Sequence, residues 1–472
     1  MRKRTEREEK IQMEKNLTTG SVLKNLLLFS MPYLLSYFLQ TLYGMADLFI
    51  IGQFGGVANT TAVSVGSQLM HMLTVMIVGL AMGTTVSIGQ AVGGKNRKQA
   101  VQNIGNTVIL FMAVSVFLTV FLLLFVRGIV LAVSTPAEAA EGTVQYLTIC
   151  FLGIPLITAY NIISSVFRGL GDSKSPMYFI AVACVCNILL DYLFMGVLRL
   201  GPAGAALGTT ISQAISVIIS LIVILKRKSI VLKKEDFKLK RQVMGKLLKI
   251  GVPIALQDGL IQVAFMVITV IANRRGLNDA AAVGIVEKII SFIFLVPSSM
   301  LSAVSALGAQ NIGAEKPQRA VQTLRYAILI AAGFGLAVSV VMQFAAESVV
   351  SLFTDQTAEG GAEVIRLGGQ YLRGYIWDSM FAGIHFSFSG YFCACGRSEL
   401  SFLHNIIAIT LVRVPGVYLT SKLFPATLFP MGLATATGSL LSVIICVIAF
   451  AGLQKDSKKQ LTNCINCDKI HN

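Results

Sequence analysis

Long apolar runs follow one another along the whole chain and are separated by short polar gaps. A helix that crosses the hydrocarbon core of a bilayer needs about 20 apolar residues. None of the runs shows the alternation of apolar and polar residues that marks the strands of a membrane β-barrel. The sequence therefore predicts an all-α membrane protein with twelve transmembrane helices, near 26–51, 61–85, 103–126, 143–169, 176–197, 203–225, 246–272, 280–303, 320–345, 365–391, 400–424 and 427–453.

The composition excludes the common soluble classes of protein. Charged residues make up 13% of the chain and the mean hydropathy is +0.73, whereas soluble domains carry about 25% charged residues. Lys and Arg number 39 against 23 Asp and Glu, an excess that would indicate a nucleic-acid partner in a soluble protein. Here the basic residues gather in alternate gaps between the apolar runs, as they do in cytoplasmic loops. We expect a multi-pass plasma-membrane protein, surrounded by lipid, with cytoplasmic termini and no nucleic-acid partner.

The longest basic gap, 226–249, follows the sixth run and divides the chain into near-equal halves. We interpret it as a cytoplasmic linker held near anionic lipid, with a ligand-sensing segment as the alternative. The expected organisation is a cytoplasmic N-terminal segment, an N-lobe with spans one to six, the linker, a C-lobe with spans seven to twelve and a cytoplasmic tail, at 1–24, 25–225, 226–245, 246–453 and 454–472.

The two halves resemble each other. Segments 90–102 (QAVGGKNRKQAVQ) and 310–322 (QNIGAEKPQRAVQ) share identities at a constant offset of 220 residues, and further identities follow at an offset of 225. Each half has an even number of spans, so both halves enter the membrane from the same side. The repeat predicts two six-helix bundles related by a pseudo-two-fold axis along the membrane normal, an arrangement that transporters use to rock around a central cavity. The matched pairs include Gln90/Gln310, Gly93/Gly313, Ala100/Ala320, Phe167/Phe392, Gly171/Gly396 and Ser173/Ser398.

Five acidic residues fall inside the apolar runs, where an ionised side chain costs about 2.5–3.5 kcal/mol. Asp47 is the sharpest candidate, because helical spacing places it on one face with Gln40 and Tyr43. The same spacing pairs Asn187 with Asp191 in the fifth span and Ala205 with Thr209 in the sixth. The remaining intramembrane acids are secondary candidates in the second half: Asp258, Glu287 and Asp378.

If these groups converge, their oxygens could hold Na+, or the two carboxyl groups could share a proton because close like charges disfavour each other's ionisation. The alternative is that the acids are separate and cap helices or face water near span ends. Pro32 interrupts the first span fifteen residues before Asp47 and acts either as a static bend or as a hinge. Lys288, next to Glu287, is expected to form a buried salt bridge with Asp258 or Asp378.

The sequence shows no machinery for nucleotide hydrolysis or covalent chemistry. It contains no G-x-x-x-x-G-K-[ST] motif, and no nucleophile–base or metal-ligand cluster is visible in it. We therefore expect no enzyme and no cofactor. ATP cannot be the direct driver, so the energy must come from an ion gradient or from the gradient of the substrate itself.

At this level of detail the chain resembles bacterial multidrug and toxic compound extrusion (MATE) transporters over nearly its whole length. The resemblance is carried by Asp47-Leu-Phe-Ile-Ile-Gly-Gln-Phe-Gly-Gly, by Gly-Gln-Ala-Val-Gly-Gly-Lys at 89–95 and by its echo at 308–316. The spacing Asn187-x-x-x-Asp191, with Thr209 eighteen residues later, is similar to the N-lobe cation site of the branch named for DNA-damage-inducible protein F. In that branch a first-span aspartate, here Asp47, completes the site and a proline corresponding to Pro32 is the hinge.

The resemblance implies a monomeric antiporter without ATP, in which Na+ or H+ enters while an amphipathic, cationic organic compound leaves. Residues expected to line the substrate cavity are Gln40, Tyr43 and Asn161. The competing function is that of a flippase for a lipid-linked or polyprenyl substrate. Such relatives often have fourteen spans and an arginine-rich cavity, whereas the near absence of basic residues from the first six spans here favours a cationic or neutral substrate.

Overall fold

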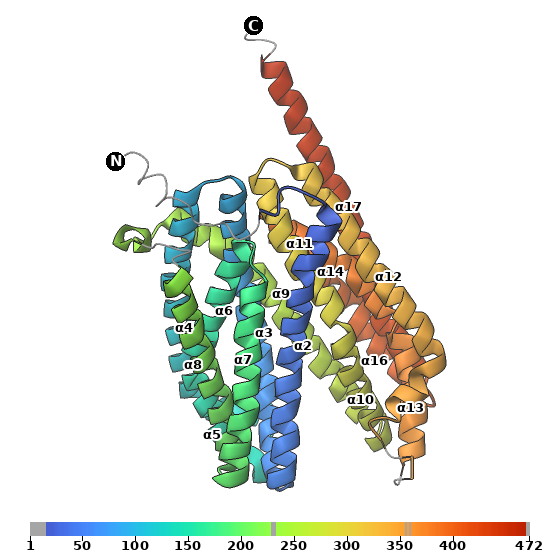
Figure 1. Cartoon of the computed structure of the whole chain (residues 1–472). Coiled ribbons are helices and arrows are strands. Elements are labelled where there is room, and N and C mark those ends of the chain that lie inside the picture. Colours follow the sequence, from blue (N-terminus) through green and yellow to red (C-terminus); the bar gives the residue numbers. More distant parts are fainter. Residues whose placement is uncertain (1–15, 228–232, 355, 358–359, 469–472) are drawn as a thin grey trace. The chain divides into compact units, whose positions relative to one another are not determined.

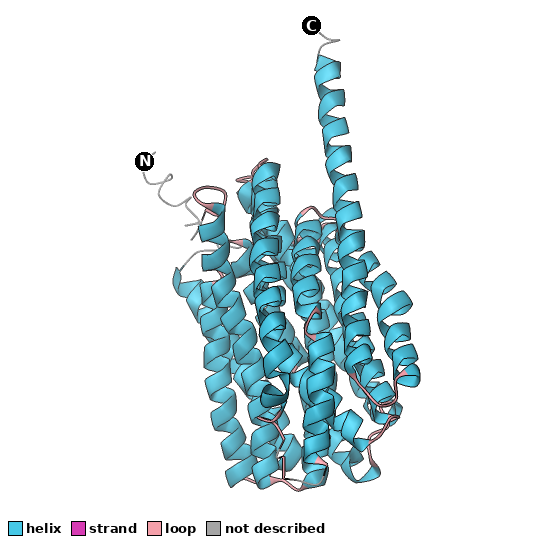
Figure 2. Ribbon diagram, turned by 90° about the vertical axis from the view of Figure 1, so that its right-hand side faces the viewer, coloured by secondary structure: helices cyan, strands magenta, loops and turns pink. Residues whose placement is uncertain are grey.

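The computed structural model describes residues 16–227, 233–354, 356–357 and 360–468. Within these residues the chain consists of helices and loops (Figure 2). The first part of the N-terminal segment, the centre of the linker and the end of the tail lie outside the described residues. The expectation of an all-helical, multi-pass membrane protein is confirmed.

Ten helical segments among the described residues are long and apolar enough to cross a membrane (Figure 1). An eleventh crossing forms if α5 (Ala137–Leu152) and α6 (Ile154–Gly169) count as one span bent by 47°. The ten are α2 (Val22–Phe54), α3 (Val57–Gly93), α4 (Arg97–Ala132), α7 with the π-helical η1 (Lys174–Asp191, Tyr192–Val197), α8 (Gly201–Arg227), α9 (Arg241–Asn273), α10 with α11 (Leu277–Ile293, Leu295–Gly313), α12 (Pro317–Val350), α15 with η3 and α16 (Ser398–Ala408, Ile409–Arg413, Val414–Leu423) and α17 (Phe429–Asp468).

The fourth and tenth of the predicted spans are each built from two helices. The fourth breaks at Gly153, where Pro155 in the first turn of α6 removes a backbone donor. The tenth comprises α13 (Gly361–Tyr375) and α14 (Asp378–Ala394). One face of α13 is buried while Arg366 and Glu363 form an ion pair on its exposed face, so this helix is amphipathic rather than uniformly apolar.

The chain forms two compact units. Unit 1 contains Met1–Gly259, Ser302–Thr323 and Cys393–Gly396, and unit 2 contains Leu260–Leu301, Leu324–Phe392 and Arg397–Asn472. In unit 1, α2, α3 and α8 pack with α5, α6 and α7, and a cluster around Ile50, Tyr146 and Phe151 is buried. In unit 2, α13 packs against α17 and α10 around the buried rings of Tyr371 and Tyr375.

Small residues bring the backbones of α3 and α9 together in unit 1. A Cβ atom added to Gly83 would overlap the carbonyl oxygen of Leu247, and one added to Gly251 would overlap that of Leu80. Lipid supplies no hydrophobic drive for helix association, so close packing of small residues holds membrane helices together. The α3–α9 crossing therefore depends on both glycines.

We predict that Gly83→Val destabilises the protein by about 1–3 kcal/mol because the larger side chain forces the α3–α9 crossing apart. Thermal denaturation of the purified protein in detergent should show a lower midpoint. Gly128→Val is the matched control, because nothing lies within 4 Å of a Cβ atom at Gly128. Equal midpoints for the two variants would contradict the importance of this contact.

Candidate functional site

Two acidic side chains lie buried together inside unit 1. Asp47, in α2, is 3% exposed, and Asp191, the last residue of α7, is fully buried. Asn187 lies one turn before Asp191 and is also buried. Because α2 packs against both α7 and α8, the side chains of three helices meet at this place. The structure thus brings Asp47, Asn187, Asp191 and Thr209 together, which spacing alone had left open.

The hydrogen bonding of this group is incomplete. Thr209 Oγ1 donates to Asp47 Oδ2 at 3.2 Å, and the Asp47 carboxyl group faces the side chains of Asp191 and Asn187. Asp47 Oδ1, Asn187 Oδ1 and both carboxyl oxygens of Asp191 have no hydrogen-bond partner among the described residues. Buried polar atoms are nearly always paired, and two ionised carboxylates at close range repel each other. The arrangement is therefore suited to a proton or a small cation between the two acids.

Two features beyond the predicted residues shape this site. A Cβ atom on Gly208 would overlap Asp191 Oδ1, so the absence of a side chain in α8 makes room for that carboxyl group. The π-helical turn η1 begins directly after Asp191, and such turns occur frequently at functional sites. Sequence reasoning missed both features, although the position of Gly208 next to Thr209 was an available signal.

Apolar and weakly polar groups surround the acids and keep the site away from bulk water. Tyr43, Tyr146 and Cys150 interact electrostatically with Asp47, and of these the sequence analysis had identified Tyr43 alone. Ala205 is fully buried in the apolar cluster of unit 1. Its methyl group carries no oxygen, so its only possible ligand atom is the backbone carbonyl.

The predicted cavity residues lie on two helices of unit 1. Gln40 and Tyr43 are partly buried on α2, and Tyr43 packs against the cluster that contains Tyr160. Asn161, on α6, is 5% exposed, and its Nδ2 donates to the carbonyl oxygen of Ile157 at 2.8 Å. The amide nitrogen of Asn161 is thus engaged by its own helix, while its side-chain oxygen is available to a ligand.

Pro32 lies buried inside α2, which continues as one helix from Val22 to Phe54. Ser36 Oγ donates to the Pro32 carbonyl oxygen at 2.7 Å. The next residue, Tyr33, lies beneath the guanidinium of Arg168, 4.4 Å from its ring centroid. Arg168 is only 8% exposed, and the sequence analysis had not singled it out as a buried cation.

In unit 2 the predicted secondary acids have partners. Asp378 accepts a hydrogen bond from Arg413 Nη2 at 2.7 Å, and the same nitrogen contacts the Tyr375 hydroxyl at 3.2 Å. Glu287 accepts from Thr269 Oγ1 at 3.3 Å. The expected salt bridge from Lys288 to Asp378 is wrong, because Arg413, thirty-five residues further along the chain, is the ion-pair partner and Lys288 is exposed.

The third secondary acid, Asp258, belongs to unit 1 rather than to unit 2. It lies on α9 beside Gly79 of α3, where an added Cβ atom would come within 2.8 Å of Asp258 Oδ2. Asp258 therefore packs into the α3–α9 crossing of unit 1.

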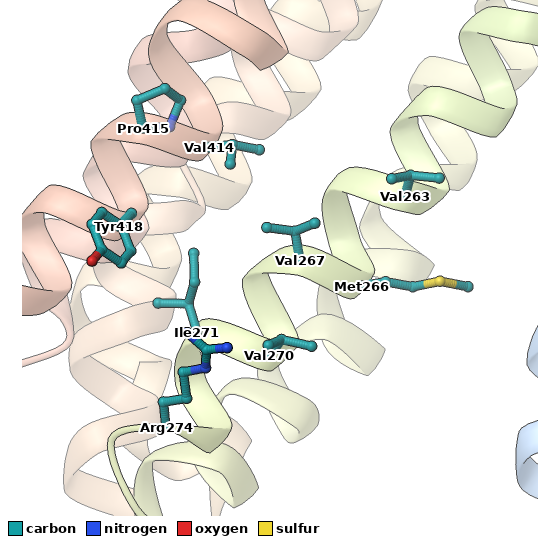
Figure 3. A pocket seen from close by; sticks show the side chains of 9 residues that line it. All are labelled: Val263, Met266, Val267, Val270, Ile271, Arg274, Val414, Pro415 and Tyr418. Carbon is teal, nitrogen blue, oxygen red and sulfur yellow. The ribbon is translucent and has the colours of Figure 1, made fainter. Parts of the chain in front are cut away.

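A cavity of about 530 Å³ opens between α9 and α16 in unit 2 (Figure 3). Aliphatic side chains dominate its wall, with Tyr418 on α16 and Arg274 at the end of α9 as its polar groups. None of the predicted cavity residues lines it. Its shape and polarity suit an apolar body such as an acyl chain or a ring system.

Comparison with known proteins places this geometry in context. The family model described as MatE matches residues 32–193 and 253–419. The probable multidrug resistance protein YpnP of Bacillus subtilis (strain 168) is 29% identical over 434 residues, which cover 90% of this chain and 93% of YpnP. The probable multidrug resistance protein YoeA of the same organism is 28% identical, over 85% of this chain and 87% of YoeA.

The fold also matches solved structures. One is described as the outward-facing conformation of a multidrug resistance MATE family transporter of the MOP superfamily. It superposes with a TM-score of 0.86 at 22% identity and covers 93% of this chain and 98% of its own.

We predict that Gly208→Ala disrupts the site by displacing the Asp191 carboxyl group. Stabilisation of the purified protein by Na+ or by a change of pH, measured as a shift of its melting temperature, should require at least about tenfold more ligand, equivalent to about 1.4 kcal/mol. Gly52→Ala in α2 is the control, because a Cβ atom there has open space around it. An unaltered ligand response in Gly208→Ala would show that Asp191 does not take part.

Proposed function

The chain belongs to the MATE family of multidrug efflux transporters, and from this premise we propose that it exchanges Na+ or H+ for amphipathic, preferably cationic, organic compounds. The family assignment makes it a multi-pass membrane transporter of small organic compounds and not an enzyme. The proposal adds the coupling ion, the residues that hold it and the charge of the substrate.

The incompletely paired carboxyl groups of Asp47 and Asp191 carry this proposal. Their free oxygens, with those of Asn187 and Thr209, form the hard ligand set that an alkali cation prefers. A proton shared by the two acids would neutralise the site equally well. The proposed ion is therefore Na+ or H+, held by the two carboxyl groups and their neutral neighbours.

The free energy released by one coupling ion is sufficient to drive export of the substrate. A charge that moves through 100 mV gains about 2.3 kcal/mol, and a tenfold ion gradient adds about 1.4 kcal/mol. Together these sustain a substrate ratio of roughly a few hundred. The exchange requires that ion and substrate favour different arrangements of the N-lobe, because a ligand shifts an equilibrium only by its differential affinity.

The substrate is proposed to bind beside Gln40, Tyr43 and Asn161, next to the acids that attract a cation. The buried guanidinium of Arg168 is the feature of unit 1 that would suit an anionic headgroup, and it keeps the lipid-flippase alternative open to test. Transport of a lipid analogue with no extrusion of organic cations would favour that alternative.

The remaining parts of the proposal concern organisation. We propose a monomer with cytoplasmic termini, divided into the N-lobe at 25–225 and the C-lobe at 246–453, and with the cation site of the branch named for DNA-damage-inducible protein F. The basic gaps between the spans support this orientation. Glu287 and Asp378 remain secondary coupling candidates in the C-lobe, and Asp258 a secondary candidate in unit 1.

We predict that Asp47→Asn abolishes extrusion of ethidium from proteoliposomes driven by imposed Na+, pH and voltage gradients, each applied separately. The amide keeps the shape of the side chain but cannot bind a proton and has no charge for a cation. Glu141→Gln is the control, because that side chain is 69% exposed. Full efflux by Asp47→Asn would remove the proposed coupling site.

Pro32→Ala is expected to slow turnover more than it weakens substrate binding, because alanine restores the backbone donor and stiffens α2. Ethidium binding measured by fluorescence anisotropy, together with transport rates, separates the two effects. Pro136→Ala, before α5, should alter neither quantity. An equal loss of binding and turnover in Pro32→Ala would count against a hinge.

A further inference from the structure

The two repeated segments form the same turn in unit 1. Lys95 and Glu315, 220 residues apart, both have left-handed backbones with φ of 54° and 58°. In each turn the amide four residues after a glutamine closes the helix: Gly94 N donates to Gln90 O, and Ala314 N donates to Gln310 O, both at 3.0 Å. The repeat in the sequence thus corresponds to a repeat in backbone structure.

The glutamines that begin these segments make reciprocal hydrogen bonds, each to a backbone carbonyl group of the other half. Gln90 Nε2 donates to the carbonyl oxygen of Ala394 at 2.8 Å. Gln310 Nε2 donates to the carbonyl oxygen of Gly169 at 3.0 Å. Gly169 and Ala394 end α6 and α14 and are themselves equivalent at the offset of 225. Each half therefore donates from its glutamine to the matching carbonyl of the other half.

The paired glycines make the same reciprocal contact. A Cβ atom on Gly93 would overlap the backbone of Gln310, and one on Gly313 would overlap the backbone of Gln90. Glycine is therefore needed at both positions, because a larger side chain would keep α3 and α11 from approaching this closely. These constraints explain why Gln90/Gln310 and Gly93/Gly313 are identical in the two segments.

A second pair of close contacts lies beside these hydrogen bonds and involves the residues whose carbonyl groups accept them. A Cβ atom on Gly169 would lie 2.8 Å from Ile88 Cβ, and one on Gly308 would lie 2.7 Å from Ala394 Cβ. Residues 88 and 308 are equivalent, as are 169 and 394. Each contact contains one glycine. In one contact the glycine is residue 169 on α6, and in the other it is residue 308 on α11.

We propose that Gln90, Gly93, Gln310 and Gly313 form a clasp that closes the transport path at the basic end of the spans, and that Gln90 and Gln310 are its gating residues. The clasp is built to be reversible. Each amide bond contributes only about 1 kcal/mol net, since water replaces the partner on opening. The contacts contain no ion pair, so the clasp does not itself need the coupling ion.

Basic residues lie beside the clasp in both turns. The first turn carries Lys95, Arg97 and Lys98, and the second carries Glu315, Lys316 and Arg319, so each turn has a net positive charge. Because interactions between charges exposed to water are weak, the repulsion between the turns lowers the stability of the clasp only slightly. Naming this end cytoplasmic rests on the orientation under the proposed function, but the existence of the clasp does not.

The test measures the distance between spin labels on Lys98 and Gln318, two exposed positions equivalent at the offset of 220. The labels are attached to introduced cysteines in a full-length chain whose eight native cysteines are replaced by serine. The distance between them is measured by pulsed electron–electron double resonance in the absence of substrate. Gln90→Glu and Gln310→Glu keep the side-chain shape but present an acceptor to a carbonyl oxygen. Gln102→Glu, on α4 outside the clasp, makes the same chemical change as a control.

Each single clasp variant should raise the population of the longer distance roughly fivefold, and the double variant roughly thirtyfold. Gln102→Glu should leave it unchanged. Distance distributions that are the same in all four proteins would overturn the proposal. Because no ion or substrate is present, this result is independent of whether drug–ion antiport is correct.

Hydrogen–deuterium exchange of the unlabelled chain with native cysteines gives a second measurement if the serine-substituted chain fails to fold. Peptides that cover 86–96 and 306–316 should exchange faster in Gln90→Ala and Gln310→Ala than in the parent chain. Because the contacts are reciprocal, each substitution should affect both peptides. Faster exchange confined to the substituted segment would indicate local fraying and contradict a clasp.

Discussion

Burial of Asp47 against Asp191 is the constraint on which the rest of unit 1 depends. Two carboxyl groups inside an apolar bundle are tolerated only when a proton, a cation or a dense set of donors balances them. Among the described residues, Thr209 Oγ1 donates to one of the four carboxyl oxygens, and the other three have no hydrogen-bond partner. A proton or a cation placed between the two carboxyl groups would therefore lower the free energy of the site.

Close backbone contact is the second theme. Where α3 meets α9, and again where it meets α11, the helices approach until carbonyl oxygens lie against glycines. Such contacts rely on shape and on polar groups rather than on the hydrophobic effect, which lipid cannot supply between helices. They are also easily lost and regained, because few atoms must change partners. This combination suits a protein that must alternate between arrangements.

Local patterns in the sequence predicted much of this protein, and long-range pairing accounts for the rest. The spacing of Asn187 and Asp191 fixes a shared helix face, and Asp47 stood out as an acid inside the first apolar run. The family resemblance joined these residues and Thr209 into one site. Gly208 and Tyr146 join the site through contacts between helices that no periodicity reveals. The partner of Asp378 was mistaken for the same reason: Lys288 was the conspicuous charge, yet the packing of unit 2 selects Arg413. Apolar runs likewise located α13 and α14 without showing the break between them.

The opposite placement of glycine in the two halves limits which residues can be exchanged between the halves. Residues 88 and 169 form an Ile–Gly pair, whereas their counterparts 308 and 394 form a Gly–Ala pair. Each half thus fits a different side chain, Ile88 or Ala394, against the backbone of a glycine. If one of these helices were exchanged between the halves without its companion, two side chains would clash at one contact, and a void would remain at the other. These packing positions can therefore be exchanged between the two halves only as pairs.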